Sequence, residues 1–194
     1  MRPPAVTRAV LGLGLGLGLG AAGCTPSPTT PAAIQREIAR SPKNTATVVI
    51  FTDFQCPYCR RAHAALAPLL AEQAGRVRVV VKHVPLRIHP RATDAARASV
   101  CGERLVRDPA ALDHALFSAD RLEPGDLVDL AAPLGAPREA FEACLSAPET
   151  SARIVSDIAE FDALRGEGVP LVFVNEVRFD GAAQAEEYRR AFSR

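Results

Sequence analysis

The sequence predicts an α/β domain in which a strand–helix–strand unit is followed by a block of helices, two further strands and a last helix. Three observations support this prediction. Short runs of apolar, mostly β-branched residues mark four strands. Amphipathic segments, several with proline near the start, lie between the second and third strands. Residues 45–194, about 150 residues, have the size of one ordinary domain.

The first half of the domain is predicted to be a strand, a helix and a second strand. Residues 47–51 form an apolar run of the kind that is typical of a buried strand. Residues 56–73 follow directly as a helix, which Pro68 is expected to bend. Residues 77–83 are again rich in valine and indicate the second strand.

The second half begins with a helical insert at residues 90–166. Proline lies near the start of four helical pieces, at positions 109, 124, 137 and 148. Ile154, Ile158 and Phe161 have helical spacing and mark a buried stripe in the last piece. The closing elements are predicted to be two strands joined by a short turn and a helix, at residues 171–174, 177–179 and 184–192.

The motif Cys56-Pro57-Tyr58-Cys59 lies where the first strand is predicted to turn into a helix. Unpaired backbone N–H groups and the helix dipole favour negative charge at a helix N-terminus. We therefore expect Cys56 to be a thiolate more readily than a free cysteine. Proline is well placed in the first turn. Cys59, one turn later, could resolve a mixed disulfide formed by Cys56.

Two cysteines at this spacing also occur in structural zinc sites, which usually bring a second pair of ligands. No second close pair follows Cys59, and His63 has the ordinary interpretation of a partly exposed helix residue. We therefore expect no metal and no other cofactor. A metal-handling or assembly protein that holds copper or zinc with this dithiol stays as a remote alternative. The methionine-poor composition and the lack of a second ligand pair argue against it.

The N-terminus predicts export. Residues 1–23 combine Arg2 and Arg8 with a short Leu-Gly repeat and small residues, as in a secretory signal peptide. The end of this segment, Ala21-Ala22-Gly23-Cys24, resembles a bacterial lipobox, although lipoboxes usually have leucine where Ala21 stands. The resemblance implies cleavage before Cys24 and a lipid on its sulfur. Ordinary cleavage nearby, which would release the protein, is the alternative.

A proline- and threonine-rich tether is predicted at residues 24–44, with a short helix at residues 32–43. Loss of Arg2 and Arg8 lowers the number of basic residues from 23 to 21, against 22 acidic residues. This balance gives no reason to expect nucleic-acid binding.

The chain has five cysteines, an odd number for an exported protein. Lipidation of Cys24 would leave four. Cys101 and Cys144 each lie on an apolar face of a predicted helix in the insert. They could be separate buried thiols or a structural disulfide, and an oxidising compartment favours the disulfide.

Four segments in this order resemble DsbA-like thiol:disulfide oxidoreductases of the thioredoxin superfamily. They are Phe51 to Arg61 around the dithiol, Lys82 to Pro90, Phe141 to Leu145, and Gly168 to Asn175. The resemblance implies a thioredoxin fold with an inserted all-helical subdomain. It also implies that Cys56 is the nucleophile, that Cys59 is its resolving partner, and that Pro170 is a cis-proline.

The same resemblance implies that Pro57, Tyr58, Val169 and Pro170 contact the substrate, with the Val169 backbone pairing with an extended chain. Thioredoxin itself has a buried acid where this chain has Ile50. Asp53 is expected nearer the surface, with strand-end capping at least as plausible a role as catalysis, and His83 and His89 are expected to be structural.

We therefore expect an exported, lipid-anchored, monomeric oxidoreductase that introduces disulfides into substrate proteins and is reoxidised by a membrane redox partner. A disulfide isomerase or a thiol reductant on the same fold is the alternative. Valine before the cis-proline, at position 169, resembles oxidases more than isomerases.

Overall fold

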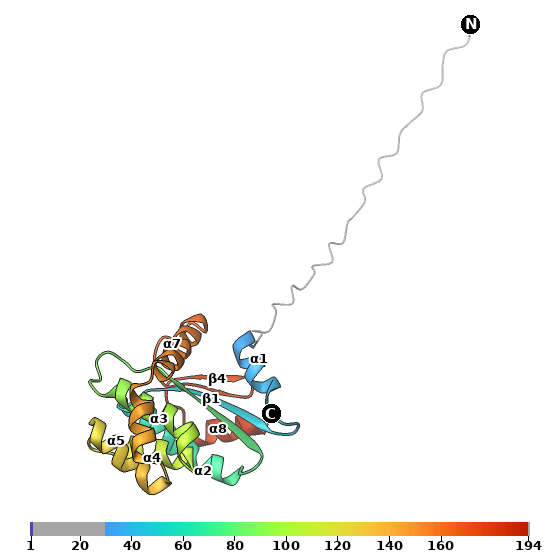
Figure 1. The fold of residues 1–194 in the computed structure, drawn as a ribbon. Coiled ribbons are helices and arrows are strands. Elements are labelled where there is room, and N and C mark those ends of the chain that lie inside the picture. Colours follow the sequence, from blue (N-terminus) through green and yellow to red (C-terminus); the bar gives the residue numbers. More distant parts are fainter. Residues whose placement is uncertain (2–29, 194) are drawn as a thin grey trace.

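The computed structural model describes Met1 and residues 30–193. The predicted signal peptide, Cys24 and the first part of the tether lie outside the described residues. Figure 1 shows the fold, with these elements in chain order: α1 Ala32–Ala39, β1 Ala46–Thr52, α2 Pro57–Glu72, β2 Val77–His83, α3 Ala92–Leu105, α4 Pro109–Ser118, α5 Pro124–Ala131, the 3-10 turn η1 Ala132–Leu134, α6 Arg138–Ser146, α7 Pro148–Ala163, β3 Leu171–Val174, β4 Val177–Asp180 and α8 Ala185–Phe192. Within the described residues, no helix is both long and apolar enough to cross a membrane.

The four strands form one sheet in the order β2-β1-β3-β4. β1 pairs in parallel with β2, through the crossover helix α2, and antiparallel with β3. β3 and β4 form a hairpin in which Asn175 has a positive φ of 52°, a conformation that asparagine tolerates in tight turns. The predicted α/β class, with its β-α-β and β-β-α halves, is confirmed.

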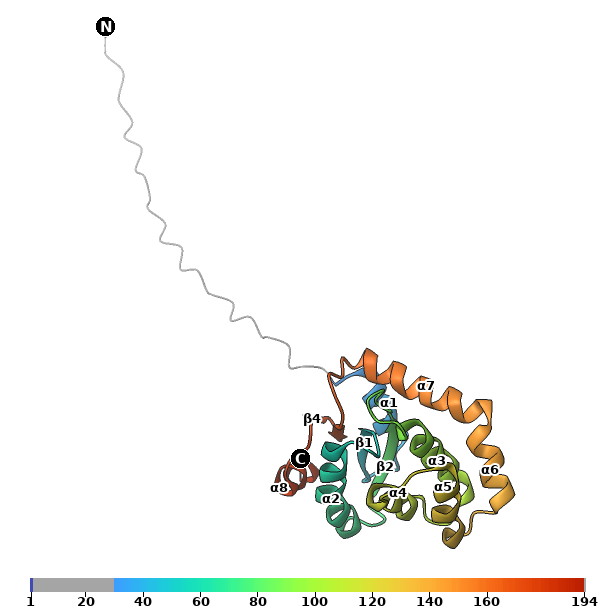
Figure 2. The same ribbon diagram turned by 90° about the vertical axis from the view of Figure 1, so that its left-hand side faces the viewer.

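Helices cover both faces of the sheet, because the side chains of a strand alternate between the two faces. Val48 of β1 packs in a cluster with Leu66 of α2 and Tyr188 of α8. Val49 and Phe51 face the other way, into the main core that includes Phe161 of α7. Figures 1 and 2 show the resulting layers, with α2 and α8 on one side of the sheet and α1 and α7 on the other.

The helices between β2 and β3 form the predicted insert (Figure 2). α3 lies at its centre and packs against α4, α5, α6 and α7. A disulfide joins Cys101 of α3 to Cys144 of α6, with their Cα atoms 5.9 Å apart. Gly102 faces Leu112 of α4 so closely that an added Cβ would lie 2.5 Å from the leucine side chain, which explains a glycine inside this helix.

Helix α1 belongs to the packed domain, although the sequence assigned its residues to the tether. Ile34 is fully buried in the main core, and Glu37 is 5% exposed. The Glu37 carboxylate pairs with Arg78 of β2 at 3.0 Å. The helix ends at Ala39, not at position 43, and its buried residues are Ile34 and Glu37. Tertiary contacts explain the difference, because only they supply partners for an isoleucine and a carboxylate in a segment of tether-like composition.

Candidate functional site

Cys56 is the N-cap of α2, and Pro57 is the first residue of that helix. The backbone of Cys56 is extended (φ −72°, ψ 123°), and its carbonyl accepts the first bond of the helix, from the Arg60 N–H at 3.0 Å. The local sequence causes this arrangement, since proline has a preset φ and no N–H to lose at this position. Cys56 thus stands at the N-terminal end of α2, although its sulfur makes no capping hydrogen bond to the helix.

Cys59 lies one turn into α2 and is almost completely buried, with 1% exposure against 4% for Cys56. Both thiols are free. Burial raises the pKa of Cys59 to about 12, although hydrogen bonds from Thr52 and from the Asp53 N–H (3.4 Å to Sγ) act in the opposite direction. Cys59 is therefore protonated at neutral pH, and Cys56 is the slightly less buried thiol of the pair.

The loop before β3 closes the site from the other side. The Val169–Pro170 peptide bond is cis, and both residues are buried. The thiol of Cys56 donates to the Val169 carbonyl at 3.8 Å, across 113 positions of sequence. The structure thus brings Cys56, Pro57, Cys59, Val169 and Pro170 together.

The rim of the site is exposed and basic. Tyr58 is 55% exposed, and the guanidinium of Arg61 lies over its ring, 4.6 Å from the centroid. Arg60 is also exposed. Tyr58 thus presents an aromatic surface beside the buried sulfurs, in a position to contact a bound chain.

Asp53 is buried, at 1% exposure, so the expectation that it lies nearer the surface is wrong. Its carboxylate accepts hydrogen bonds from the backbone N–H groups of Gln55 and Leu86, both at 2.8 Å, and lies 2.8 Å from Nδ1 of His89. Asp53 therefore ties the active-site turn to the loop after β2. Sequence reasoning missed this role because the loop that supplies two partners is more than 30 positions away.

His83 is fully buried and pairs with Asp157 of α7, 3.1 Å from its Nδ1. Burial alone would raise the pKa of Asp157, but the hydrogen bond from His83 and the charge of Arg153 outweigh it and hold that pKa below its ordinary value. This pair fixes the insert to β2. Among the described residues, no group of three or more His, Cys, Asp or Glu side chains is arranged to hold a metal ion.

Comparison with known proteins places this geometry in a family. A family model described as thioredoxin matches residues 40–193. A thioredoxin-like oxidoreductase from Silicibacter pomeroyi DSS-3 is 27% identical, with a TM-score of 0.67 over 78% of this chain and 87% of that one. The thiol-disulfide exchange protein alpha-DsbA2 from Wolbachia pipientis has the same fold, with a TM-score of 0.67 and 17% identity over 79% of this chain and 83% of that one.

A curated relative carries a similar segment inside a larger protein. The Na(+)/H(+) antiporter NhaA 3 of Salinispora tropica is 33% identical over 158 residues, which are 80% of this chain but only 24% of the antiporter. The chain thus spans about a quarter of the length of this relative. The match over residues 40–193, the β-α-β and β-β-α halves, and the dithiol facing a cis-proline lead to one conclusion: this chain belongs to the thioredoxin family.

Proposed function

We propose that this protein is an exported thiol–disulfide oxidoreductase that introduces disulfides into substrate proteins through Cys56 and Cys59. The observation that carries the proposal is the position of Cys56, at the N-cap of α2 and against the carbonyl of Val169. A helix N-terminus stabilises a thiolate, and the backbone beside it can pair with an extended chain.

The reaction moves two electrons from substrate to protein. A substrate thiolate attacks Sγ of Cys56 in the oxidised site, the Cys56–Cys59 bond breaks, and the Cys59 sulfur leaves and takes up a proton. A second substrate thiolate then attacks the substrate sulfur of the mixed disulfide and releases Cys56 as a thiolate. The substrate is left with a disulfide and the protein with a dithiol, which a membrane redox partner must reoxidise.

The pKa of Cys59 supports this division of roles. Because burial raises it to about 12, Cys59 stays protonated at neutral pH, which leaves the role of nucleophile to Cys56 at the N-cap of α2. A helix N-terminus favours a thiolate, and a dithiol pair whose reduced form is stabilised is oxidising.

The test is the reduction potential of the Cys56–Cys59 pair, measured by equilibration with glutathione buffers. We expect a potential above that of thioredoxin, which is about −270 mV. The mature protein should also oxidise a reduced, unfolded protein, while Cys56→Ser should not. Cys59→Ser should accumulate a mixed disulfide with the substrate when supplied as the disulfide of a small thiol.

A potential at or below that of thioredoxin would instead support a reductant. Rescue of a substrate with wrong disulfides, without net oxidation, would support an isomerase.

Export and anchoring are part of the same proposal. The resemblance of residues 1–23 to a signal peptide, and of Gly23-Cys24 to a lipobox, supports attachment to a membrane through Cys24. Cys24→Ala should move the protein out of the membrane fraction or block its processing. Equal amounts of soluble protein from both forms would indicate ordinary signal cleavage.

A further inference from the structure

The outer edge of β2 is an incompletely covered edge of the sheet. β2 is an end strand, and the N–H of Val84 bonds the carbonyl of Thr52 on β1 at 2.9 Å. Backbone groups alternate in direction along a strand, so the even-numbered residues of β2 face β1 and the odd-numbered ones face outward. Val77, Val79 and Val81 therefore direct their N–H and C=O groups away from the sheet.

Only the end of this edge nearest the dithiol is capped by side chains. The Val81 carbonyl accepts from Nη2 of Arg153 at 3.2 Å, and the N–H of His83 donates to Asp157 at 3.0 Å. Within residues 30–193, no hydrogen bond reaches the outward groups of Val77 and Val79. Val79 is also 40% exposed, which is unusual for a β-branched apolar residue in a regular strand.

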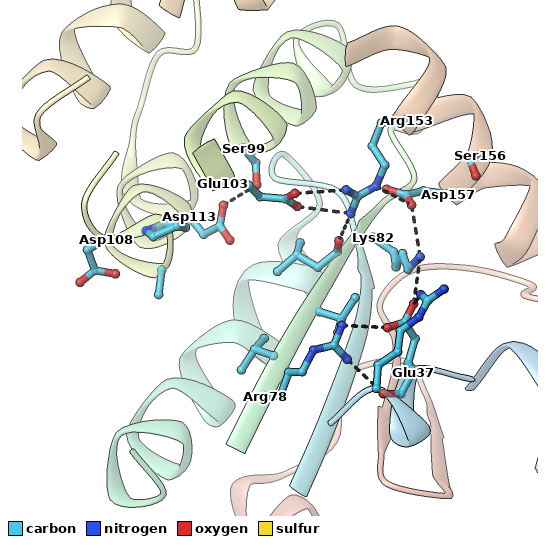
Figure 3. Close-up of a pocket in the computed structure, with 16 residues that line it drawn as sticks. Glu37, Arg78, Lys82, Ser99, Glu103, Asp108, Asp113, Arg153, Ser156 and Asp157 are labelled. Atoms are coloured by element: carbon cyan, nitrogen blue, oxygen red, sulfur yellow. Dashed lines mark hydrogen bonds and ion pairs between the residues drawn. The ribbon is translucent and has the colours of Figure 1, made fainter. Parts of the chain in front are cut away.

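Two cavities meet along this edge, one on each side of the strand. The first, of about 520 Å³, lies between β2 and α2 and is lined mainly by apolar side chains, among them Leu66, Leu70 and Phe117. The second, of about 670 Å³, is lined mainly by charged side chains (Figure 3). Both include Val79 and Val81 of β2 and the first turns of α4, so a gap follows the edge between β2 and α4.

The α4 side of this gap carries two carboxylates. Asp108 caps α4 by accepting from the Ala111 N–H, and Asp113 accepts from the Ser99 hydroxyl at 2.6 Å. In the described part of the chain neither forms a salt bridge, whereas Arg153, the nearby guanidinium, is engaged by Glu103 and Asp157. Figure 3 shows Asp113 beside Glu103, whose carboxylate pairs with Arg153, and Asp108 farther from these ion pairs. Burial raises the pKa of Asp113 to about 6, the negative charge of Glu103 acts in the same direction, and the hydrogen bond from Ser99 acts against it.

We propose that the outer edge of β2 is a docking site for an extended peptide segment of a partner protein. The segment adds as a strand in the gap between β2 and α4, and its backbone pairs with Val77, Val79 and the N–H of Val81. Its apolar side chains enter the apolar cavity, and a lysine or arginine reaches Asp108 and Asp113. This site is separate from the Val169 side of the dithiol, so it gives the protein a second contact with a polypeptide.

A single strand suits the site better than a second copy of this chain. α4 forms the far wall of the gap, so an edge-to-edge pairing of two β2 strands would have to fit a second α4 beside the first. A peptide strand needs only the width of one backbone, about 5 Å in the hydrogen-bonding direction.

The test measures binding of a cysteine-free, fluorescent peptide of alternating valine and lysine with threonine at each end, by fluorescence anisotropy. Val79→Pro removes only an outward N–H and leaves the ladder with β1 intact, as proline allows on edge strands. Val79→Pro should lower the affinity for the peptide at least tenfold. Val79→Thr, which keeps the N–H and the β-branch, should have an affinity within about twofold of that of the unmodified protein.

Charge is tested separately. The double variant Asp108→Asn/Asp113→Asn should bind the lysine peptide with at least fivefold lower affinity. Asparagine keeps the helix cap at position 108 and the hydrogen bond from Ser99 at position 113, but it removes both negative charges. Asp120→Asn, an exposed site, is the matched control and should have no effect. A glutamate version of the peptide should bind at least tenfold more weakly than the lysine version.

A series of modified peptides tests the same pairing with the unmodified protein, in case Val79→Pro does not fold. N-methylation of the peptide N–H groups along one edge should abolish binding, while methylation along the other edge should not. The proposal is overturned if the peptide does not bind, if both methylated series bind equally, or if the glutamate version binds as tightly. It is also overturned if the unmodified protein forms dimers that Val79→Pro dissociates and the peptide does not bind, because the edge would then serve self-association.

Discussion

Removal of the Cys101–Cys144 disulfide tests what holds the helical insert together. The bond joins α3 to α6 across 43 positions of sequence, and the chain between its ends contains α4 and α5. Cys101 is fully buried and Cys144 is 7% exposed. Replacement of both by alanine removes the cross-link but keeps two small apolar residues in the core. Thr150, whose hydroxyl lies near both sulfurs, keeps its bond to the Cys144 carbonyl at 2.8 Å.

The length of the closed loop determines the expected magnitude. For 43 residues the chain-entropy treatment gives about 4 kcal/mol of stabilisation, through restriction of the unfolded chain. For a domain of this size, each kcal/mol corresponds to about 2–4 °C in Tm. We therefore expect Cys101→Ala/Cys144→Ala to unfold about 8–16 °C lower than the parent protein.

The assay is thermal unfolding followed by circular dichroism, in a Cys56→Ala/Cys59→Ala background so that only the second pair responds to reductant. Dithiothreitol should lower the Tm of this background to that of the variant with all four substitutions, and should leave the latter unchanged. With Cys56 and Cys59 restored, Cys101→Ala/Cys144→Ala should still oxidise substrate thiols below its Tm. A fall in Tm of less than about 3 °C, which corresponds to about 0.8–1.5 kcal/mol, would refute the loop-closure argument.

Three further predictions concern buried groups. Asp157→Asn should cost about 3–5 kcal/mol near neutral pH, because it removes a buried carboxylate that pairs with Arg153 at 3.1 Å and lies 3.1 Å from Nδ1 of His83. Because the pKa of Asp157 is lowered in the fold, this stability is present above the unfolded pKa and is lost as pH falls through the folded pKa. The difference between variant and parent in the free energy of unfolding, measured in urea, should therefore narrow below about pH 4. In Cys56→Ser, the rate at which iodoacetamide alkylates Cys59 should still rise about tenfold per pH unit between about pH 8 and 10, because the pKa of Cys59 is about 12. A plateau of this rate near pH 9 would contradict that pKa. Asp53→Ala should lower the free energy of unfolding by about 3 kcal/mol, because two backbone N–H groups lose their acceptor. A change below about 0.5 kcal/mol in a urea titration would show that water replaces the carboxylate as acceptor.

Much of the fold follows from local sequence patterns. The strands at positions 77–83 and 171–174 have the predicted bounds, and the first strand differs by one residue at each end. These runs are predictable because β-branched and other apolar residues favour strands. The helical insert has proline at helix starts and a buried stripe at Ile154 and Phe161, both of which are local signals.

The part of the site that lies in one continuous segment, residues 56–59, could also be predicted from the sequence. Cys56 and Cys59 could be assigned to a helix start because the preceding strand and Pro57 adjoin them in sequence. The resemblance to a known family directed attention to Val169 and Pro170, and the structure places the Val169 carbonyl 3.8 Å from Cys56 Sγ. Periodicity and composition alone would have left that proline as the start of an ordinary strand.

By itself, the sequence determined the order and type of the elements and the location of the dithiol, because backbone preferences and apolar periodicity act over a few residues. Only the tertiary structure decided which polar groups are buried together. Asp53 accepts a hydrogen bond from the loop after β2, and Glu37 of α1 forms an ion pair with Arg78 of β2. Asp108 and Asp113 line the cavity at the outer edge of β2. The physical reason is that burial and charge depend on neighbours brought together across 30 to 110 positions, and no local pattern records which neighbours those are.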